Sequence, residues 1–300
     1  MRIAVTGRQG QVVSCLIEAA CKWPGLEVIP LGRPDLDLTV PSTIEPAIAA
    51  ARPHLVVSAA AYTSVDLAED EPELAYSVNA TGAGAAARAA GELGIPIIHL
   101  STDYVFSGDK QGSYVEGDAT GPLSVYGASK LAGEQAVIAA NTQHLILRTA
   151  WVYSAYGKNF VKTMMRLAQD RQELSVVGDQ WGSPTSAHDI ADCVLHIASR
   201  VTSDASFADW GVYHLAGHGE INWSGFARHI LQTSKRQGGP FAHVNDIATA
   251  DYPTRARRPA NSRLGTEKLS AAFGWSSPHW QEAADAVVAS VIPHLTKVRR

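Results

Sequence analysis

The chain has 300 residues, of which 46% are hydrophobic and 18% are charged, and its formal net charge is −4. Lys and Arg form no long run, which argues against nucleic acid or an anionic membrane surface as the main partner. No apolar stretch reaches the roughly 20 residues that a membrane span needs, and a strand that starts at the third residue predicts that there is no signal peptide.

The three cysteines, Cys15, Cys21 and Cys193, follow no recognised spacing. An odd number without a CxxC pair argues against a disulfide framework and against a structural zinc site. We therefore expect a cytoplasmic protein that is soluble and globular.

Short β-branched runs alternate with Ala-rich segments through the first half of the chain. Strands are predicted at Ile3–Thr6, Glu27–Leu31, Leu55–Val57, Ile95–Ser101 and His144–Thr149. Helices are predicted at Gln11–Lys22, Pro46–Arg52, Pro72–Leu93 and Tyr126–Ala140.

This alternation predicts an α/β fold with a doubly wound parallel Rossmann-type sheet. The rhythm changes after Trp151, where we expect one more helix at His188–Arg200, a surface loop at Val201–Asp209 and a strand at Val212–Leu215. We predict a dinucleotide-binding domain of residues 1–150 and 184–215. Residues 151–183 and 216–300 are predicted to form a smaller C-terminal substrate-binding lobe.

The turn after the first predicted strand contains Gly7 and Gly10 and leads into a helix at Gln11 and Val12. Bare amides at such a helix start can hold a pyrophosphate, although a plain glycine turn would look the same. The third glycine of the usual fingerprint is replaced by Val13, so we expect looser dinucleotide binding or adjusted packing at this point.

The end of the second strand bears on the choice of cofactor. Enzymes that prefer NAD usually place a carboxylate there, whereas this chain has Arg33, a cation that could hold a 2′-phosphate. The position favours NADPH, with NADH left open, because a solvated surface arginine is the other interpretation.

The sharpest pattern is the segment Tyr126–Lys130, in which a Tyr and a Lys are four residues apart on a helix and share one face. A neighbouring ammonium favours the phenolate, so we expect Lys130 to lower the pKa of Tyr126 toward the working range of a proton donor. Thr102 ends the fourth strand, where the ligand crevice of a parallel sheet lies. It is expected to hydrogen-bond a substrate oxygen, unless it only caps the strand.

Several segments together resemble the dTDP-4-dehydrorhamnose reductase family of the extended short-chain dehydrogenase/reductase superfamily. The resemblance runs from residue 1 to about residue 285 and rests on Ala59–Asp66, Ser101–Phe106, Tyr126–Glu134, Arg148–Tyr153, Asp179–Thr185 and Arg258–Leu264.

The resemblance implies NADPH-dependent reduction of dTDP-4-dehydro-β-L-rhamnose to dTDP-L-rhamnose, with Tyr126 as proton donor and Lys130 and Thr102 as its partners. It implies that Thr102, Asp103 and Trp151 contact the sugar. The cofactor would contact Gly10, Gln11, Val12, Asp37, Leu38, Ala61, Tyr62, Thr63, Tyr126 and Lys130. Arg255, Arg257 and Arg258 would neutralise the diphosphate or form a solvated charge cluster.

Two departures concern single positions. Ser58 stands where the family has Asn, and Cys15 stands where some relatives have a carboxylate that binds Mg²⁺ near a subunit interface. The resemblance therefore argues against a metal at this position, while a homodimer stays open without it.

Two other functions remain under consideration. One is another nucleotide-sugar reductase or epimerase on the same scaffold; a 4,6-dehydratase would need a second carboxylate where Tyr104 stands. The other is a non-catalytic NADP-binding regulatory subunit, which would have little need of the intact Tyr126, Lys130 and Thr102.

Overall fold

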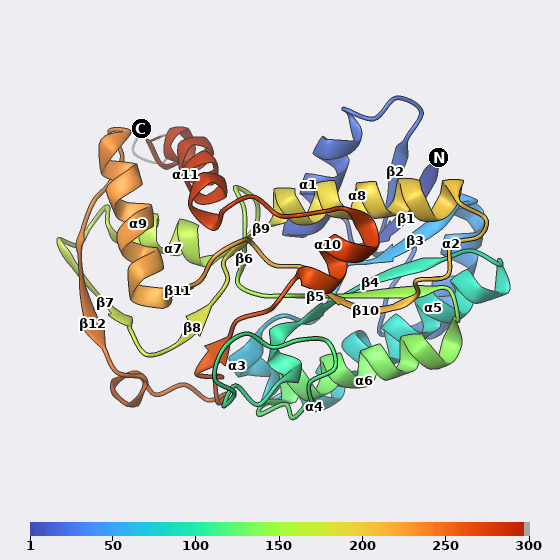
Figure 1. The fold of residues 1–300 in the computed structure, drawn as a ribbon, viewed down its shortest axis with the longest axis horizontal. Helices are drawn as coiled ribbons and strands as arrows, with labels where there is room; N and C mark the ends of the chain where they lie inside the picture. The colour runs from blue at the N-terminus through green and yellow to red at the C-terminus, as the bar shows by residue number, and fades with distance from the viewer. Residues whose placement is uncertain (297–300) are drawn as a thin grey trace.

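The computed structural model describes residues 1–296, and its main element is a six-stranded parallel sheet in the order β2-β1-β3-β4-β5-β10 (Figure 1). Chain order reverses at β1, and in such sheets the ligand crevice lies at the carboxyl ends of the strands beside this switch point. The predicted fold class is confirmed. The strands are β1 (Arg2–Thr6), β2 (Glu27–Leu31), β3 (Leu55–Ser58), β4 (Ile97–Thr102), β5 (His144–Thr149) and β10 (Gly211–His214).

Helices cover both faces of this sheet (Figure 1). Successive strand side chains point to opposite faces, so Val57 joins the core beneath α1 and α8 while Val56 joins the core on the other side. This explains the uninterrupted apolar runs in the sequence. One face carries α1 (Gln11–Ala20) and α8 (Ala187–Ser203), and the other carries α2 (Ile44–Ala51), α5 (Ala83–Glu92) and α6 (Val125–Ala140).

The helix predicted at Pro72–Leu93 is interrupted. It consists of α4 (Pro72–Tyr76), a π-helical segment at Ser77–Gly82, and α5. The side chain of Asn79 in this segment bonds to the backbone of a neighbouring loop, which favours the wider turn. The prediction of one regular helix was wrong at this turn.

The loop predicted at Val201–Asp209 begins later in the structure, after Ser203. Helix α8 continues to Ser203, because Thr202 and Ser203 bond back to carbonyl groups of the preceding turn. Short helices complete this part of the chain: η1 (Pro41–Thr43), α3 (Val65–Ala68) and η3 (Asp103–Val105).

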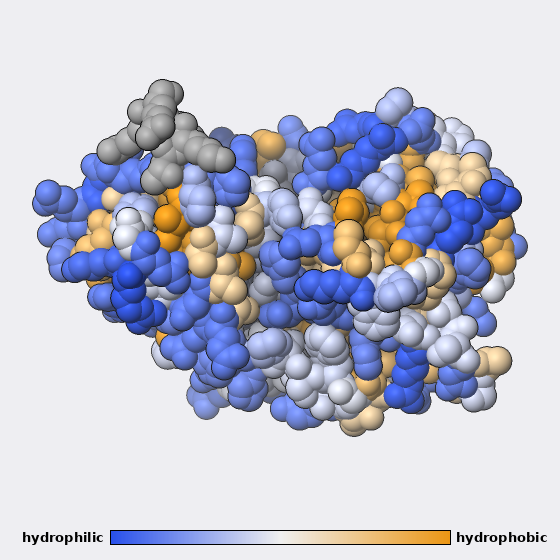
Figure 2. Space-filling model, turned by 90° about the horizontal axis from the view of Figure 1, so that it is seen from above, coloured by the Kyte–Doolittle hydropathy of each residue, from blue (hydrophilic) through white to orange (hydrophobic). Residues whose placement is uncertain are grey.

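The rest of the chain builds a second apolar core, which includes Phe226, Ile230 and Trp280. Figure 2 shows hydrophobic side chains reaching the upper surface in two separate areas, one over each half of the molecule. The division into a domain and a lobe stays a prediction, and α10 packs against the first core through Leu269 and Phe273.

The elements of this second part are short strands and four helices. The strands are β6 (Val152–Tyr153), β7 (Glu173–Val177), β8 (Trp181–Gly182), β9 (Thr185–Ser186), β11 (Ile221–Asn222), β12 (His243–Ile247) and β13 (Asn261–Ser262). The helices are α7 (Phe160–Leu167), α9 (Trp223–Arg236), α10 (Glu267–Phe273) and α11 (Trp280–Thr296), with the short η4 (Thr249–Asp251). Within residues 1–296, no helix is both long and apolar enough to cross a membrane.

Candidate active site

Helix α6 brings Tyr126 to the end of β4. The helix begins after Ser124, whose side chain accepts a hydrogen bond from the Gly127 amide at 3.2 Å. Gly127 packs so closely on the turn after β4 that an added Cβ would lie 2.2 Å from the Tyr104 carbonyl oxygen. Only glycine permits this approach, which places the start of α6 beside Thr102 and Asp103.

The Tyr126 phenol is half-buried, and its ring meets the Tyr104 ring edge-on, with the ring centroids 5.5 Å apart. Burial raises its pKa above the ordinary value, and the charge of Asp103 acts in the same direction, while hydrogen bonding with Thr102 lowers it. The phenol is therefore protonated at neutral pH. The sequence predicted that Lys130 lowers this pKa, but in the described chain burial raises it and Lys130 is not among the groups that shift it.

Lys130 lies on the same face of α6, one turn further along, and only 3% of it is exposed. Its ammonium donates to the Leu100 carbonyl oxygen at 2.7 Å and lies 3.4 Å from His99 Nε2. Burial lowers the pKa of Lys130 to about 8, and the charge of Glu134 opposes this shift. The sequence missed His99 and Leu100 as partners, because they belong to β4 and not to α6.

A buried ion pair fixes the next turn of α6. Glu134 accepts from Arg148 on β5 at 2.9 Å and 2.7 Å and from the Ser101 hydroxyl on β4 at 2.5 Å. Both charged side chains are almost fully buried. This pair was not predicted from the sequence, although Tyr126, Lys130 and Glu134 follow one another at four-residue spacing, which could have indicated a polar face.

Thr102 and Asp103 lie together at the carboxyl end of β4. The Thr102 hydroxyl donates to Asp103 Oδ1 at 2.9 Å, and Oδ2 has no hydrogen-bond partner in the described chain. Burial raises the pKa of Asp103 to about 6, although hydrogen bonding with Ser262 and Thr102 lowers it. A buried acceptor oxygen beside Thr102 is suited to a ligand hydroxyl.

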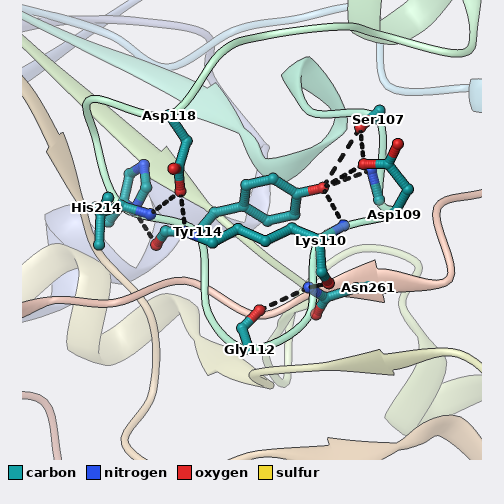
Figure 3. A network of polar contacts seen from close by, with 10 residues as sticks. Ser107, Asp109, Lys110, Gly112, Tyr114, Asp118, His214 and Asn261 are labelled. Atoms are coloured by element: carbon teal, nitrogen blue, oxygen red, sulfur yellow. Dashed lines mark hydrogen bonds and ion pairs between the residues drawn. The ribbon is translucent and has the colours of Figure 1, made fainter.

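The loop that joins this site to α6 is held around Tyr114 (Figure 3). The Tyr114 hydroxyl accepts from the Gly108 amide at 2.9 Å, and Lys110 forms an ion pair with Asp118. Asn261 of β13 donates to the Lys110 carbonyl at 2.8 Å, next to Ser262. The C-terminal part of the chain thereby helps to shape the site at Asp103.

The glycine turn has the geometry expected of a dinucleotide site. Gly7 adopts φ 103°, which favours glycine, and Gly10 begins α1, where no described side chain caps the helix. An added Cβ on Gly10 would meet only Val13, at 3.9 Å. Val13 is buried in the core and approaches Gly7, which has no side chain to obstruct it. Val13 therefore fits beside the glycine turn in this chain.

Gln11 and Val12 form the first turn of α1. The Gln11 side-chain oxygen accepts from Ser154 at 2.9 Å and Asn159 at 3.0 Å, and so ties this turn to the second part of the chain. Its backbone amide stays with the helix start, where it is available to a phosphate.

The residues after β2 lie next to the glycine turn. Arg33 is exposed, and Arg8 of the glycine turn forms an ion pair with Asp35. Asp37 accepts from the amide and hydroxyl of Thr39, and these bonds lower its pKa. Leu38 is buried, and its carbonyl lies against the π-helical segment.

The loop Ala61–Thr63 follows β3 and is held by Asn79. The Asn79 side chain accepts from the Tyr62 amide at 2.8 Å and donates to Ser129 on α6 at 2.9 Å. The Tyr62 hydroxyl donates to Glu71 at 2.7 Å, and burial with this contact raises the pKa of Tyr62 to about 12. Asn79 was missed because the segment looked like the middle of an ordinary helix.

Trp151 belongs to an aromatic stack at the start of the second part. Its backbone has φ 49°, which is strained for a residue other than glycine, and its ring stacks on Trp223, with the centroids 3.5 Å apart. Trp223 lines a cavity of about 950 Å³, together with Phe160, Tyr252, Arg171 and Arg258.

The arginines of the C-terminal segment are partly neutralised. Arg258 donates to Asp66 at 2.7 Å, and Arg255 forms an ion pair with Asp70. Arg258 also acts on the Tyr104 hydroxyl, where its charge opposes the effect of burial on the pKa. Arg258 therefore connects the cavity with the tyrosine that packs on Tyr126.

Cys15 is buried in the core beneath α8, and burial raises the pKa of its thiol to about 12. Across residues 1–296 the structure contains no group of three or more His, Cys, Asp or Glu side chains arranged to hold a metal ion.

The parallel sheet, the glycine turn at a helix start, and Tyr126 with Lys130 beside the fourth strand define an extended short-chain dehydrogenase/reductase. The particular family follows from comparison with known proteins. The chain matches the family model described as RmlD substrate binding domain over residues 1–292, and it belongs to this family.

The relatives agree with the resemblance seen in the sequence. The chain is 51% identical over 288 residues to the dTDP-4-dehydrorhamnose reductase of Sinorhizobium fredii, which covers 96% of this chain and 97% of the relative. A dTDP-4-dehydrorhamnose reductase structure from Clostridium acetobutylicum has a TM-score of 0.89 at 35% identity and covers 96% of this chain and 98% of its own. Another from Bacillus anthracis, in complex with NADP, has a TM-score of 0.87 at 35% identity and covers 95% and 98%.

Proposed function

We propose that this chain is an NADPH-dependent reductase that converts dTDP-4-dehydro-β-L-rhamnose into dTDP-L-rhamnose. The observation that carries the proposal is the position of the Tyr126 phenol, which forms a hydrogen bond with Thr102 at the crevice end of β4. The names of the similar proteins support the same reaction.

The glycine turn fits a dinucleotide. An uncapped helix start attracts a pyrophosphate, and the space at Gly10 lets it approach the main chain. Gly7, Gly10, Gln11 and Val12 would hold the phosphates, with Asp37 and Leu38 beside the adenine and Ala61, Tyr62 and Thr63 beneath the ribose and nicotinamide. When bound, the reduced nicotinamide supplies a hydride.

The residues of the chain supply the proton. With substrate bound, Thr102 would turn its single O–H from Asp103 Oδ1 to the C4 carbonyl oxygen and polarise it, and Tyr126 would transfer its hydroxyl proton to O4 as C4 is reduced. With that hydride on C4 and the Tyr126 proton on O4, the carbonyl double bond would become a C–H and an O–H bond, and Tyr126 would then recover a proton from solvent. Lys130 stabilises the transient phenolate and binds the ribose.

The cavity beside Trp223 is suited to the nucleotide of the substrate. Aromatic rings such as Phe160 and Trp223 can cover a base, and Arg258 and Arg171 can meet a diphosphate. Trp151, stacked on Trp223, would form an apolar wall for the deoxysugar, and Asp103 would accept from a sugar hydroxyl.

The test is the absorbance of reduced nicotinamide with dTDP-4-dehydro-L-rhamnose as substrate. We expect one NADPH oxidised per dTDP-L-rhamnose formed, and much slower oxidation with a UDP-linked 4-keto sugar. Tight NADP binding without oxidation would contradict the proposal and favour the regulatory subunit. Interconversion of C4 epimers without net oxidation would favour an epimerase.

Cofactor preference can be tested at Arg33. If this guanidinium holds the 2′-phosphate, Arg33→Ala should weaken NADPH binding about five- to tenfold, which corresponds to the loss of one exposed charged hydrogen bond. NADH binding should not change. Equal effects on both cofactors in a fluorescence titration would show that Arg33 is only a surface residue. A homodimer, cytoplasmic location and the absence of a metal requirement stay predictions.

A further inference from the structure

His99 is a buried histidine behind the Tyr126–Lys130 pair. It lies on β4, opposite Ser58 of β3 in the sheet register, and it is 1% exposed. Its Nδ1 is 3.0 Å from the Ser58 hydroxyl, and its Nε2 is 3.4 Å from the Lys130 ammonium. An imidazole thus connects the lysine of the site to the position at which the sequence departs from the family pattern.

The partners decide which ring nitrogen carries the proton. A lysine ammonium can only donate, so His99 Nε2 must accept from Lys130. The proton then lies on Nδ1 and is donated to Ser58 Oγ. Burial and the nearby ammonium hold the pKa of His99 well below its usual range, which keeps the ring neutral and able to accept.

The same contacts orient the ammonium. An ammonium has three N–H groups, and β4 takes two of them, through the Leu100 carbonyl at 2.7 Å and the His99 ring. The third makes no hydrogen bond to another of the described residues. A lysine on a flexible four-carbon stem would otherwise sample several directions.

We propose that His99, supported by Ser58, is a positioning residue that holds the Lys130 ammonium so that its remaining N–H group faces the bound cofactor and Tyr126. The expected effect of His99 on catalysis rests on the proposed reductase function. The contacts themselves do not depend on the identity of the substrate.

The first test compares His99→Leu with His99→Gln. Leu cannot accept a hydrogen bond, so we expect kcat to fall about tenfold and the Kd of NADP⁺ to rise severalfold, as one charged hydrogen bond is lost. The loss of kcat at high pH should begin at a lower pH than in the wild type. The reason is that the Lys130 ammonium loses an acceptor that stabilises its charge, so its pKa falls. The groups that act on the Lys130 ammonium are the His99 ring, the Leu100 carbonyl and Glu134, and the charge of Glu134 still favours the cation.

Gln carries a side-chain oxygen that can replace Nε2 as the acceptor. His99→Gln should therefore recover most of the wild-type kcat and restore the wild-type decline of kcat at high pH. The matched control is His196→Leu, which removes a half-buried histidine that contacts the Phe273 carbonyl on the other side of the sheet. This control should lower the melting temperature without shifting the pH profile.

Ser58→Ala gives a milder variant if His99→Leu does not fold. It should raise the Kd of NADP⁺ and alter the ¹⁵N chemical shift of His99 Nδ1, which NMR of the wild type should show as protonated. Unchanged NADP⁺ affinity and pH profile in folded His99→Leu would overturn the proposal, as would a wild-type ring protonated at Nε2. These binding and NMR results need no sugar substrate, so they remain decisive even if the proposed reaction is wrong.

Discussion

Helices α6 and α8 are similar in length, with 16 and 17 residues, and they cover opposite faces of the same sheet. They bury different chemistry. Helix α8 packs Ile190, Val194 and Ile197 into the core, as an ordinary amphipathic helix does. Helix α6 buries Ser129, Lys130 and Glu134, and Val137 is its one large apolar residue among those buried.

The polar residues that α6 buries indicate that this side of the sheet serves the active site. A buried charge costs several kcal/mol unless partners compensate it, and an apolar replacement is often at least as stable. On α6 every such group has partners on the neighbouring strands: Leu100 and His99 for Lys130, and Arg148 and Ser101 for Glu134. Apolar packing would satisfy stability alone, so we interpret this polar face as retained for the chemistry of Tyr126.

The largest expected effect comes from removing the proton donor of α6. Tyr126→Phe keeps the packing of the ring and removes the hydroxyl, so kcat should fall about 10²- to 10⁴-fold, as is typical of a lost general acid. The Kd of NADPH should change little. The control Tyr104→Phe removes the neighbouring hydroxyl and keeps the ring that packs on Tyr126, so it should lower kcat less than tenfold. Near-normal turnover of Tyr126→Phe would contradict the assignment of Tyr126 as proton donor.

The second prediction compares the helices in stability. Glu134→Gln leaves the Arg148 charge buried without its counter-ion, so the free energy of unfolding should fall by about 3–5 kcal/mol in urea denaturation. The pKa of Lys130 should also fall, because Glu134 favours the cation.

The matched variant on α8 is Leu195→Ala, which opens a cavity in the apolar core and should cost about 2–5 kcal/mol. Its kcat per folded molecule should match the wild type, whereas that of Glu134→Gln should not. If both variants lose stability but keep the wild-type kcat, the buried polar face of α6 does not contribute to catalysis.

The smallest effect concerns Asp103, next to the start of α6. Its folded pKa of about 6 lies above that of an unfolded Asp, so the folded chain loses stability as the pH rises from about 4 to 6, and the full penalty is present above that. Asp103→Asn should therefore stabilise the protein by about 3 kcal/mol at pH 7.5 and by less at pH 4.5. Thermal denaturation at both pH values measures this difference in stability. An equal stabilisation by Asp103→Asn at both pH values would show that ionisation of Asp103 does not destabilise the folded chain.

Much of the fold could be predicted because its signals are local. Apolar runs in Leu55–Ser58 and the periodic Ala-rich helices specify strands and helices within a few residues. The π-helical turn at Asn79 could not be predicted in this way, because it depends on Tyr62 and Ser129, which lie 17 and 50 residues away. The same reason hid the contacts of Ser262 and Arg258 with the site.

The sequence by itself determined the order of strands and main helices in the first 150 residues, the glycine turn, and the placing of Tyr126 and Lys130 on one helix face, because these follow from backbone preferences and fixed helical spacing. Only the tertiary structure decided the protonation of these groups and their partners. Burial raises the pKa of Tyr126 and lowers that of Lys130, and the hydrogen bonds that orient Lys130 come from a strand 30 residues earlier in the chain. Desolvation and contact between distant segments exist only once the chain has folded.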